Sequence, residues 1–511
     1  MIDPITLEVA RHRFSAVATE MGMVLRRTAL SPNIKERADC SAAVFTADGA
    51  MLAQAEHIPV HLGSMPASVA ACLQEFDPEP GAQYAVNDPY HGGTHLNDLT
   101  LVAPVFSGSN LIGWVGNRAH HADVGGEAPG SMPAHAVRLD QEGHVVPPTI
   151  AVRRGDWVED FVEPFVTASR TPWERRGDLG AQIGANAVAA RRLASLVDTE
   201  GRERFEEVSG ALLDYGERRM TAALAVMPDG VYEFEDWMEH GDRDVAIRVR
   251  VTIDGESLHA DFAGTDPQVE ANFNAVEAVT RSCLYYAVRV ATDPSIPAND
   301  GCYRPIGLHA PLGTIVNARP PAAVAAGNVE TSQRIADVLL GALAGAAPER
   351  VPAASQGTMN NVLIGSDEFA YYETVAGGQG ARPYRDGQSG IQTGMTNTQN
   401  TPIESLHAHY PFRVVAYTLR RGSGGAGRYR GGDGIRRELT FGAPATLSLM
   451  GERRRHSPWG LAGGEPGAVG EDWLVTKDGE RHLLPGKTTI DVEPGDRLVV
   501  LTPGGGGWGV P

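Results

Sequence analysis

Three observations in the sequence predict a mixed α+β protein with several domains. An amphipathic helical pattern opens the chain, alternating apolar and polar residues predict strands at several later points, and the 60 glycines become denser toward the C-terminus. A chain of 511 residues has room for about three domains. We place a helix-and-hairpin domain at residues 1–228, a middle α/β region at 229–352 and a strand-rich region at 353–511, with the first boundary at the Pro228-Asp229-Gly230 turn.

Composition and charge exclude several classes of protein. Lysine and arginine total 44 against 63 aspartates and glutamates, so the net charge is −19, and nucleic acid or an anionic membrane would repel the chain. No run of about eighteen apolar residues predicts a membrane span, and the N-terminus lacks the plan of a signal peptide. The four cysteines are scattered without a CxxC pair, which is typical of a reduced, cytoplasmic protein.

Three long helices are predicted in the first region. Asp3 caps a helix that begins at Pro4, and apolar residues then recur at spacings of three and four for about six turns. Helical periodicity returns at residues 178–196 and again at about 200–226. Residues 124–180 are expected to be mostly loop and turn.

A hairpin is predicted after the first helix. Apolar residues 41–45 and 51–54 flank a Thr-Ala-Asp-Gly turn, whose Asp48-Gly49 pair suits a two-residue loop. This loop would return Asp39 to the neighbourhood of His57, so that an acidic and an imidazole group meet at one end of the hairpin. For both residues, a polar role beside a turn explains the pattern as well as a role in a site does.

A second hairpin joins two clusters of polar groups. Two apolar runs are separated by Ser-Gly-Ser-Asn, and if Ser107 pairs with Leu111, Asn110 takes the left-handed position of a three-residue loop. That register places Asp98 directly opposite His120. A slip of one residue would instead put the two side chains on opposite faces.

Residues 87–123 hold seven groups that can bind a metal or move protons. They are Asp88, His91, His95, Asp98, His120, His121 and Asp123. Their convergence across the hairpin favours a metal site over a set of hydrogen-bonded turn residues, and mixed imidazole and carboxylate ligands suit Mn(II), Fe(II) or Zn(II) rather than Ca(II). His121 must point away from His120 if both lie on a strand, so one of this pair supports a ligand or acts as a base.

The middle and C-terminal regions are predicted from shorter patterns. Residues 231–262 alternate like strands with a turn at Asp254-Gly255, and helices are expected at 276–291 and 332–346, the second capped by Thr331. Beyond residue 353, short strands alternate with glycine turns.

Two motifs resemble nucleotide-binding loops by spacing alone. Gly422-x-Gly424-x-x-Gly427 has the dinucleotide spacing, but the residues that follow, RYRGGDG, cannot open a helix. Gly486-Lys487-Thr488 resembles the end of a phosphate-binding loop, but position 481 is Arg instead of the required Gly. We therefore predict that neither motif binds a nucleotide.

Several stretches of the chain together resemble the hydantoinase B/oxoprolinase family. They are NDPYHGGTHLNDLTLVAPVF, RAHHADVGG, GDLGAQIGAN, YETVAGGQGARPYRDGQSG, TNTQNTPIESL and TPGGGGWG. The similarity runs from Ile5 to the last residue. This family includes the B subunits of N-methylhydantoinases, relatives of 5-oxoprolinase and caprolactamase, and the matching subunits of acetone and acetophenone carboxylases.

The resemblance implies a metal-containing enzyme subunit that works with a partner. In this family a separate A-type subunit with an actin-like ATPase fold uses ATP to phosphorylate a carbonyl oxygen of the substrate. The B-type subunit holds a divalent metal and completes the reaction. The resemblance implies that His95, Asp98 and His120 are metal ligands, with Asp39 as the fourth.

The expected function is therefore the opening of a cyclic amide whose carbonyl oxygen has been phosphorylated by the partner. Phosphorylation removes the amide resonance and creates a leaving group, and water activated by the metal would then attack. His121 or Asp123 would be the base, and His57 would orient or protonate the substrate. Three alternatives stay open: a subunit of a ketone carboxylase, a non-catalytic scaffold with a structural metal, and a free-standing metal hydrolase that needs no ATP.

Overall fold

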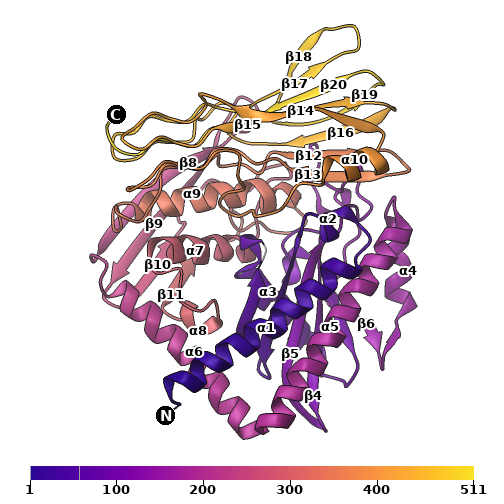
Figure 1. The fold of residues 1–511 in the computed structure, drawn as a ribbon, viewed down its shortest axis with the longest axis vertical. Coiled ribbons are helices and arrows are strands. Elements are labelled where there is room, and N and C mark those ends of the chain that lie inside the picture. The colour runs from indigo at the N-terminus through magenta and orange to yellow at the C-terminus, as the bar shows by residue number, and fades with distance from the viewer. Residues whose placement is uncertain (1, 57) are drawn as a thin grey trace.

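The structure is a computed structural model that describes residues 2–56 and 58–511 (Figure 1). The described residues form four β-sheets together with long and short helices, so the predicted mixed α+β class is confirmed. In Figure 1 the indigo and magenta N-terminal segments fill the lower part of the molecule, and the yellow C-terminal segments form its top.

The largest sheet has seven strands in the order β2-β1-β5-β4-β3-β6-β7. These strands are β1 (Cys40–Thr46), β2 (Met51–Glu56), β3 (Gln83–Val86), β4 (Asp98–Ser107), β5 (Asn110–His120), β6 (Thr149–Arg153) and β7 (Asp156–Trp157). Alternate residues of β1 face two different hydrophobic clusters: Ala42 and Val44 belong to one, and Ala43 and Phe45 to the other. The sheet is therefore buried on both faces.

Helices cover both faces of this sheet. Those of the first region are α1 (Pro4–Thr28), α2 (Pro32–Lys35), α3 (Ser64–Glu75), α4 (Glu159–Ala168), α5 (Pro172–Glu200) and α6 (Arg202–Leu224). The three predicted long helices are present, and the Asp3 carboxylate accepts hydrogen bonds from the backbone of Ile5 and Thr6 at the start of α1. The expectation of loop for residues 124–180 was wrong at α4 and at the start of α5, which begins at Pro172 rather than at residue 178. Pro164 lies inside the ten-residue α4, and proline is unfavourable in a helix interior, so the sequence pattern did not predict this helix.

Both predicted hairpins have the expected register but a different loop. β4 and β5 pair Asp98 with His120, as predicted, although Ser107 pairs with Asn110 and only two residues form the loop. A bulge between Val105 and Phe106, in which Ile112 of β5 has no partner on β4, makes up the difference of one residue.

The β1–β2 hairpin deviates in the opposite sense. The Thr46 N–H donates to the Ala50 carbonyl around a three-residue loop that ends in Gly49 at φ +90°, where two residues were predicted. A bulge again restores the register, and Ser41 pairs with Glu56 as expected. His57 lies outside the described residues.

The middle region is a four-stranded sheet with two helices against it. Its elements are β8 (Gly230–Met238), β9 (Val245–Asp254), β10 (Ser257–Asp261), α7 (Glu277–Ala291), α8 (Asp300–Tyr303), β11 (Ile306–His309) and α9 (Ser332–Leu343). The predicted turn at Asp254-Gly255 and the helices α7 and α9 are confirmed. The prediction that Thr331 caps α9 was wrong. A π-helical turn, Gly327–Thr331, runs directly into α9, and the Thr331 hydroxyl instead donates to the Phe273 carbonyl.

The C-terminal region consists of two sheets that share a hydrophobic cluster. One sheet has the order β13-β12-β16-β19, with β12 (Asn361–Gly365), β13 (Ala370–Thr374), β16 (Ala445–Met450) and β19 (Lys487–Val492). The other has the order β14-β15-β20-β17-β18, with β14 (Phe412–Arg420), β15 (Gly434–Phe441), β17 (Glu471–Val475), β18 (Arg481–Leu484) and β20 (Arg497–Leu501). A short helix, α10 (Ile403–His409), precedes β14.

In both motifs that resemble nucleotide-binding loops, the residues make contacts within the fold. A Cβ on Gly424 would lie 1.9 Å from the Gly431 carbonyl oxygen, and one on Gly505 would lie 2.1 Å from the carbonyl oxygen of Gln379. Glycine is thus required where these C-terminal loops lie backbone against backbone. Lys487 begins β19, and its ammonium group pairs with the buried carboxylate of Glu452.

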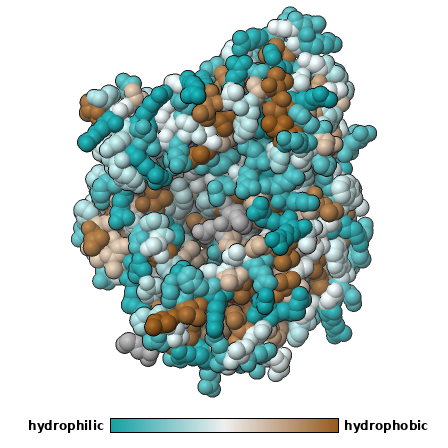
Figure 2. All heavy atoms as spheres, viewed as in Figure 1, coloured by the Kyte–Doolittle hydropathy of each residue, from teal (hydrophilic) through white to brown (hydrophobic). Residues whose placement is uncertain are grey.

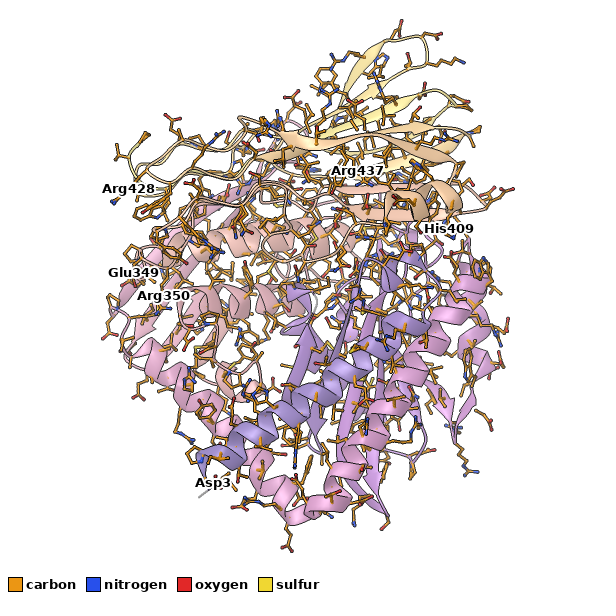
Figure 3. All side chains as sticks on the ribbon, in the orientation of Figure 1. Asp3, Glu349, Arg350, His409, Arg428 and Arg437 are labelled. Atoms are coloured by element: carbon orange, nitrogen blue, oxygen red, sulfur yellow. The ribbon has the colours of Figure 1, made fainter. Side chains whose placement is uncertain are left out.

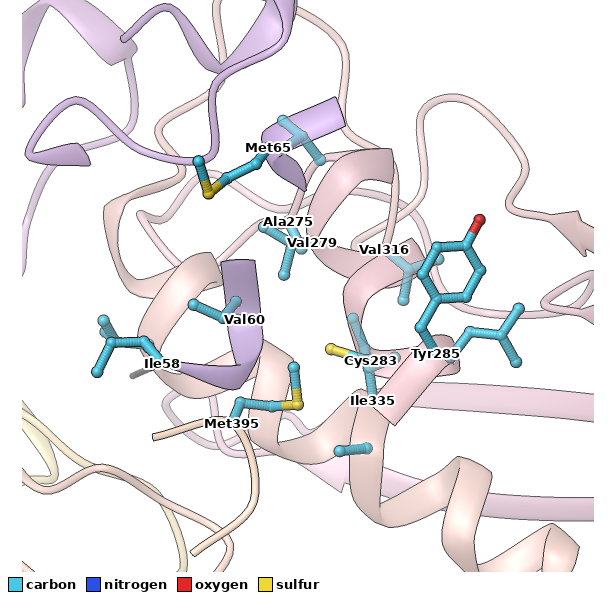
Figure 4. Packing of buried hydrophobic residues seen from close by; sticks show 14 of the residues in the cluster. Ile58, Val60, Met65, Ala275, Val279, Cys283, Tyr285, Val316, Ile335 and Met395 are labelled. Atoms are coloured by element: carbon cyan, nitrogen blue, oxygen red, sulfur yellow. The ribbon is translucent and has the colours of Figure 1, made fainter. Parts of the chain in front are cut away.

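The largest hydrophobic cluster takes residues from all three predicted regions, from Ala43 to Met450. Figure 4 shows part of it, in which Val60 lies between α7 and Met395. On the face shown in Figure 2, apolar surface is broken up by hydrophilic side chains. Within the described residues, no helix has the length and apolar character that crossing a membrane requires. The division into three regions stays a prediction.

Candidate metal centre

Three side chains converge at the open end of the second hairpin. Asp98 begins β4 and His120 ends β5, so the pairing of these strands places them side by side. His95 approaches from the preceding loop. Its Nε2 is 3.1 Å from Asp98 Oδ1, and His120 Nδ1 is 3.2 Å from the same oxygen. One ligand atom of each residue lies within 4.8 Å of the other two, and all three residues are buried.

Two of the histidine nitrogens at this point are left without partners. His95 Nδ1 and His120 Nε2 are buried and have no hydrogen-bond partner among the described residues, whereas His95 Nε2 and His120 Nδ1 both face Asp98 Oδ1. Buried polar atoms in that state are rare, because each costs the free energy of its lost hydration. Two imidazoles and a carboxylate that meet at one point form a donor set that fits a divalent transition metal.

Burial prepares these groups to bind a metal. It lowers the pKa of His120 to about 3, so the ring is neutral at pH 7 and keeps a lone pair to donate. For Asp98, burial alone would raise the pKa, but His95, His120 and His61 hold it well below its usual range. Asp98 is therefore a carboxylate at every physiological pH.

Asp39 lies in the wall of the same small cavity as Asp98 and His120. Its carbonyl oxygen accepts a hydrogen bond of 3.0 Å from the His120 N–H, which ties β5 to the segment before β1. Its carboxylate stands outside the group of three whose ligand atoms converge. Burial raises the pKa of Asp39 to about 7, and the negative charge of Asp98 adds to the rise. A cation between the two carboxylates would relieve their repulsion.

His61 is a neighbour of Asp98 that the sequence analysis missed. It ends a 3₁₀ turn, Pro59–His61, and its Nε2 is 3.3 Å from Asp98 Oδ2 while its Nδ1 is 2.8 Å from Ser41 Oγ. Burial lowers the pKa of His61. A neutral ring fits these contacts if Nε2–H donates to Asp98 and the Ser41 hydroxyl donates to Nδ1. The signal was present in the HIPVH stretch, which contains a second histidine besides His57.

Residues from much later in the chain complete the cavity. Asn328 lies on the π-helical turn, and its Nδ2 donates to Asp98 Oδ2 at 3.4 Å. Its Oδ1 is buried and has no partner within the described part of the chain. Tyr372 of β13 stacks on the ring of His120. Neither residue could be found from local patterns, because long-range folding brings each of them to the hairpin.

The residues expected to act as the base have other partners. His121 directly follows β5, so the strand alternation does not extend to it, and its Nε2 lies 2.9 Å from Gln182 Oε1 on α5. The Asp123 carboxylate accepts from the backbone N–H groups of Gly125 and Gly130 and pairs with Arg170 at 2.9 Å. Neither side chain lines the small cavity. His57, which was expected to orient or protonate the substrate, lies outside the described residues.

The two remaining polar residues of the cluster pair with each other. His91 Nδ1 lies 2.7 Å from Asp88 Oδ2, and the imidazole of His91 is 65% exposed. Gly92 follows at φ +96°, and a Cβ on Gly93 would lie 2.4 Å from the Asn87 carbonyl oxygen. These glycines allow the tight loop that delivers His95 to the cavity.

Comparison with known proteins identifies the family of this chain. The family model described as Hydantoinase B/oxoprolinase matches residues 3–511. The chain belongs to this family. An uncharacterised protein of Methanocaldococcus jannaschii is 42% identical over 100% of this chain and 91% of its own length. The 5-oxoprolinase 1 of Arabidopsis thaliana is 39% identical over 99% of this chain, which spans only 42% of that longer protein.

Solved structures agree with the sequence comparison. The ATP-dependent caprolactamase of Pseudomonas jessenii has a TM-score of 0.94 and 30% identity, covering 100% of this hydantoinase B/oxoprolinase chain and 92% of the matched chain. A nucleotide-free acetone carboxylase structure has a TM-score of 0.90 over 99% of this chain and 76% of its own. At 20% identity this second likeness establishes the fold alone.

Proposed function

We propose that this chain is the metal-containing B-type component of an ATP-dependent cyclic amide hydrolase. The observation that carries the proposal is the buried cluster of His95, Asp98 and His120 with its unpartnered ring nitrogens. The names of the relatives supply the substrate class, because 5-oxoproline, hydantoin and caprolactam are all cyclic amides.

An A-type subunit with an actin-like ATPase fold is proposed as the partner. A relative from a Pseudomonas species is named as the B-type component of a D-/L-hydantoinase, and the caprolactamase is named as ATP-dependent. The Arabidopsis 5-oxoprolinase has a further part, more than half of its length, that this chain does not match. We propose that the partner corresponds to that part and phosphorylates the amide oxygen, which removes the resonance that protects the amide.

In this proposal His95, Asp98 and His120 hold the metal, and Asp39 is the fourth ligand. A bound Mn, Zn or Fe ion would lower the pKa of the attacking water. Water would add to the ring carbon that carries the phosphorylated oxygen, and the ring C–N bond would break as the nitrogen takes a proton. A second water would then release phosphate and leave the ring-opened acid. The proposal specifies the class of metal, a divalent ion that imidazole and carboxylate ligands bind well, and not the element.

The chain's own residues then position and deprotonate the water. His61 donates to Asp98 Oδ2 and fixes the orientation of that carboxylate. Asp39 lies in the wall of the same cavity and would offer one carboxylate oxygen as a ligand and the other as acceptor of the proton. Asn328 Oδ1 accepts a hydrogen bond from the ring N–H or the water. His121 and Asp123 support the hairpin end in this scheme, and the orienting role of His57 stays a prediction.

The experiment compares ADP release with ring-opened product in the complex with the A-type partner. In the wild type the two should be coupled. In Asp98→Ala the partner should still phosphorylate the substrate, whereas ring opening should fall to the spontaneous rate. Coupled turnover at the wild-type rate in Asp98→Ala would contradict the proposal, and ring opening by this chain without ATP would establish the free-standing hydrolase instead.

A further inference from the structure

A cavity of about 670 Å³ adjoins the metal centre. Thr396 lines both this cavity and the small cavity around Asp98. The 3₁₀ turn that carries His61 forms the rest of the partition, because Pro59 lines the large cavity whereas Ile58 and Val60 line the small one. Figure 4 shows this turn against α7 and Met395. A small molecule in the large cavity would therefore be separated from Asp98 and His120 by this turn and Thr396.

The lining of the large cavity has an apolar wall and several unpartnered polar groups. Val290 of α7 and Leu340 of α9 contribute to the apolar wall. On the polar side, the Thr393 hydroxyl, Gln392 Oε1 and Trp459 Nε1 are buried and lack a hydrogen-bond partner in the described chain. Thr393 itself is only 7% exposed. Such groups lose free energy unless a ligand or water completes their hydrogen bonds, and an amide offers both a donor and an acceptor.

Four charged residues line the cavity, and the exposed Glu349 and Arg350 lie at its rim. Asp337 is neutralised by Arg453 at 2.5 Å and by Arg334 at 3.4 Å. Arg350 lies at the rim, at the edge of the molecule in Figure 3, and donates to the Thr292 carbonyl. The half-buried guanidinium of Arg382 has neither a hydrogen bond nor an ion pair to any residue of 2–56 or 58–511.

We propose that this cavity is the substrate site of the metal centre and that Arg382 binds an anionic group of the substrate. The inference rests on the proposed function and adds the class of substrate. A guanidinium that is free to make two parallel hydrogen bonds recognises a carboxylate or a phosphoryl group. The carboxylate would belong to the substrate itself, whereas the phosphoryl group would be the one added by the partner.

Two cyclic amides of equal ring size can show whether Arg382 binds the substrate carboxylate or the phosphoryl group. 5-Oxoproline carries a carboxylate on its five-membered ring, and 2-pyrrolidone is the same ring without it. Ring opening of both should be measured in the complex for the wild type, Arg382→Gln, Arg382→Lys and the control Arg385→Gln, which alters an exposed arginine of the same loop. Because the Arg382 guanidinium has no partner among the residues that the structure describes, Arg382→Gln should keep the wild-type melting temperature.

If Arg382 binds the carboxylate, Arg382→Gln should lower kcat/KM about tenfold or more for 5-oxoproline, through KM, and leave 2-pyrrolidone unchanged. If it binds the phosphoryl group, both substrates should fall by the same factor. In either case Arg382→Lys should recover part of the loss and Arg385→Gln should match the wild type. Unchanged kinetics for both substrates in Arg382→Gln would overturn the proposal.

A binding measurement keeps the inference separate from the proposed function. The metal-loaded chain alone should be titrated with 5-oxoproline and with inorganic phosphate. If the complex opens neither ring, weaker binding of either ligand to Arg382→Gln than to Arg385→Gln still supports the anion site, while the hydrolase assignment fails. Equal binding in both variants, or none in the wild type, would refute the anion site.

Discussion

Tyr372 lies flat against the imidazole of His120, with ring centroids 4.7 Å apart and an angle of 20° between the planes. The guanidinium of Arg37 lies 4.7 Å from the centre of the tyrosine ring, and the tyrosine hydroxyl donates to Asn361 Oδ1 at 2.8 Å. A strand of the C-terminal region therefore holds a ring of the first region in place. The candidate metal centre therefore depends on contacts between segments far apart in the chain.

The first prediction concerns this stack. Tyr372→Ala should lower the free energy of unfolding by about 3–5 kcal/mol, as for other buried aromatic truncations, and should weaken metal binding because His120 loses its support. Tyr372→Phe keeps the stacked ring and should cost only about 1 kcal/mol for the lost hydrogen bond. Denaturant unfolding and chelator competition would measure both effects. Equal metal affinity in Tyr372→Ala and the wild type would show that the stack does not position the histidine.

The second prediction is metal content. The protein as isolated should carry up to about one divalent transition metal per chain, and His95→Ala, Asp98→Ala and His120→Ala should each lose most of it. His91→Ala is the matched control, because this exposed histidine on the same loop pairs only with Asp88 among the described residues. Elemental mass spectrometry gives the content directly. Full retention of metal in all three variants would remove the basis of the proposed function.

Local sequence patterns found the core of this site but not its surroundings. The pairing of Asp98 with His120 follows from strand alternation, and it survived an error in the loop because a bulge at Val105 compensated. Local patterns could not predict Asn328 and Tyr372, because a helical turn and a strand far away in the sequence bring them to the hairpin. His61 was within reach, because the same hairpin argument that pointed to His57 applied to its near neighbour.

The third prediction tests His61 as a positioning residue. His61→Ala removes the donor to Asp98 Oδ2 and the partner of Ser41, and metal affinity should fall by about 10–100-fold. His61→Gln supplies an amide N–H and should recover part of that affinity. Chelator competition measures the metal, and thermal unfolding is the parallel readout. A loss of stability with metal affinity unchanged would mean that His61 serves the fold alone.

The fourth prediction is the pH dependence of the metal-free protein. Burial raises the pKa of Asp39 from its ordinary 3.8 to about 7, so the folded state binds its proton more tightly than the unfolded state does. This carboxyl should therefore destabilise the fold progressively as pH rises from about 4 to 7, by about 1.4 kcal/mol for each unit of pKa difference. The lowered pKa of His120 acts in the opposite sense between about pH 3 and 6.5. The difference in unfolding free energy between the wild type and Asp39→Asn isolates the Asp39 contribution and should grow toward pH 7.

The last prediction concerns how metal affinity depends on pH through the same Asp39 proton. Below about pH 7 the Asp39 carboxyl is protonated in the metal-free protein, so a metal that uses this ligand must displace the proton. Because of the Asp39 carboxyl, the apparent metal affinity should fall about tenfold for each pH unit below 7. Metal binding should also release a proton, which a pH-indicator dye in weakly buffered solution would detect. His120 adds nothing to this dependence above pH 5, because its pKa is about 3. Asp39→Asn should bind the metal more weakly at pH 8 but with a flatter pH profile than the wild type. If both proteins show the same profile, Asp39 is not a ligand and the fourth position belongs to another group.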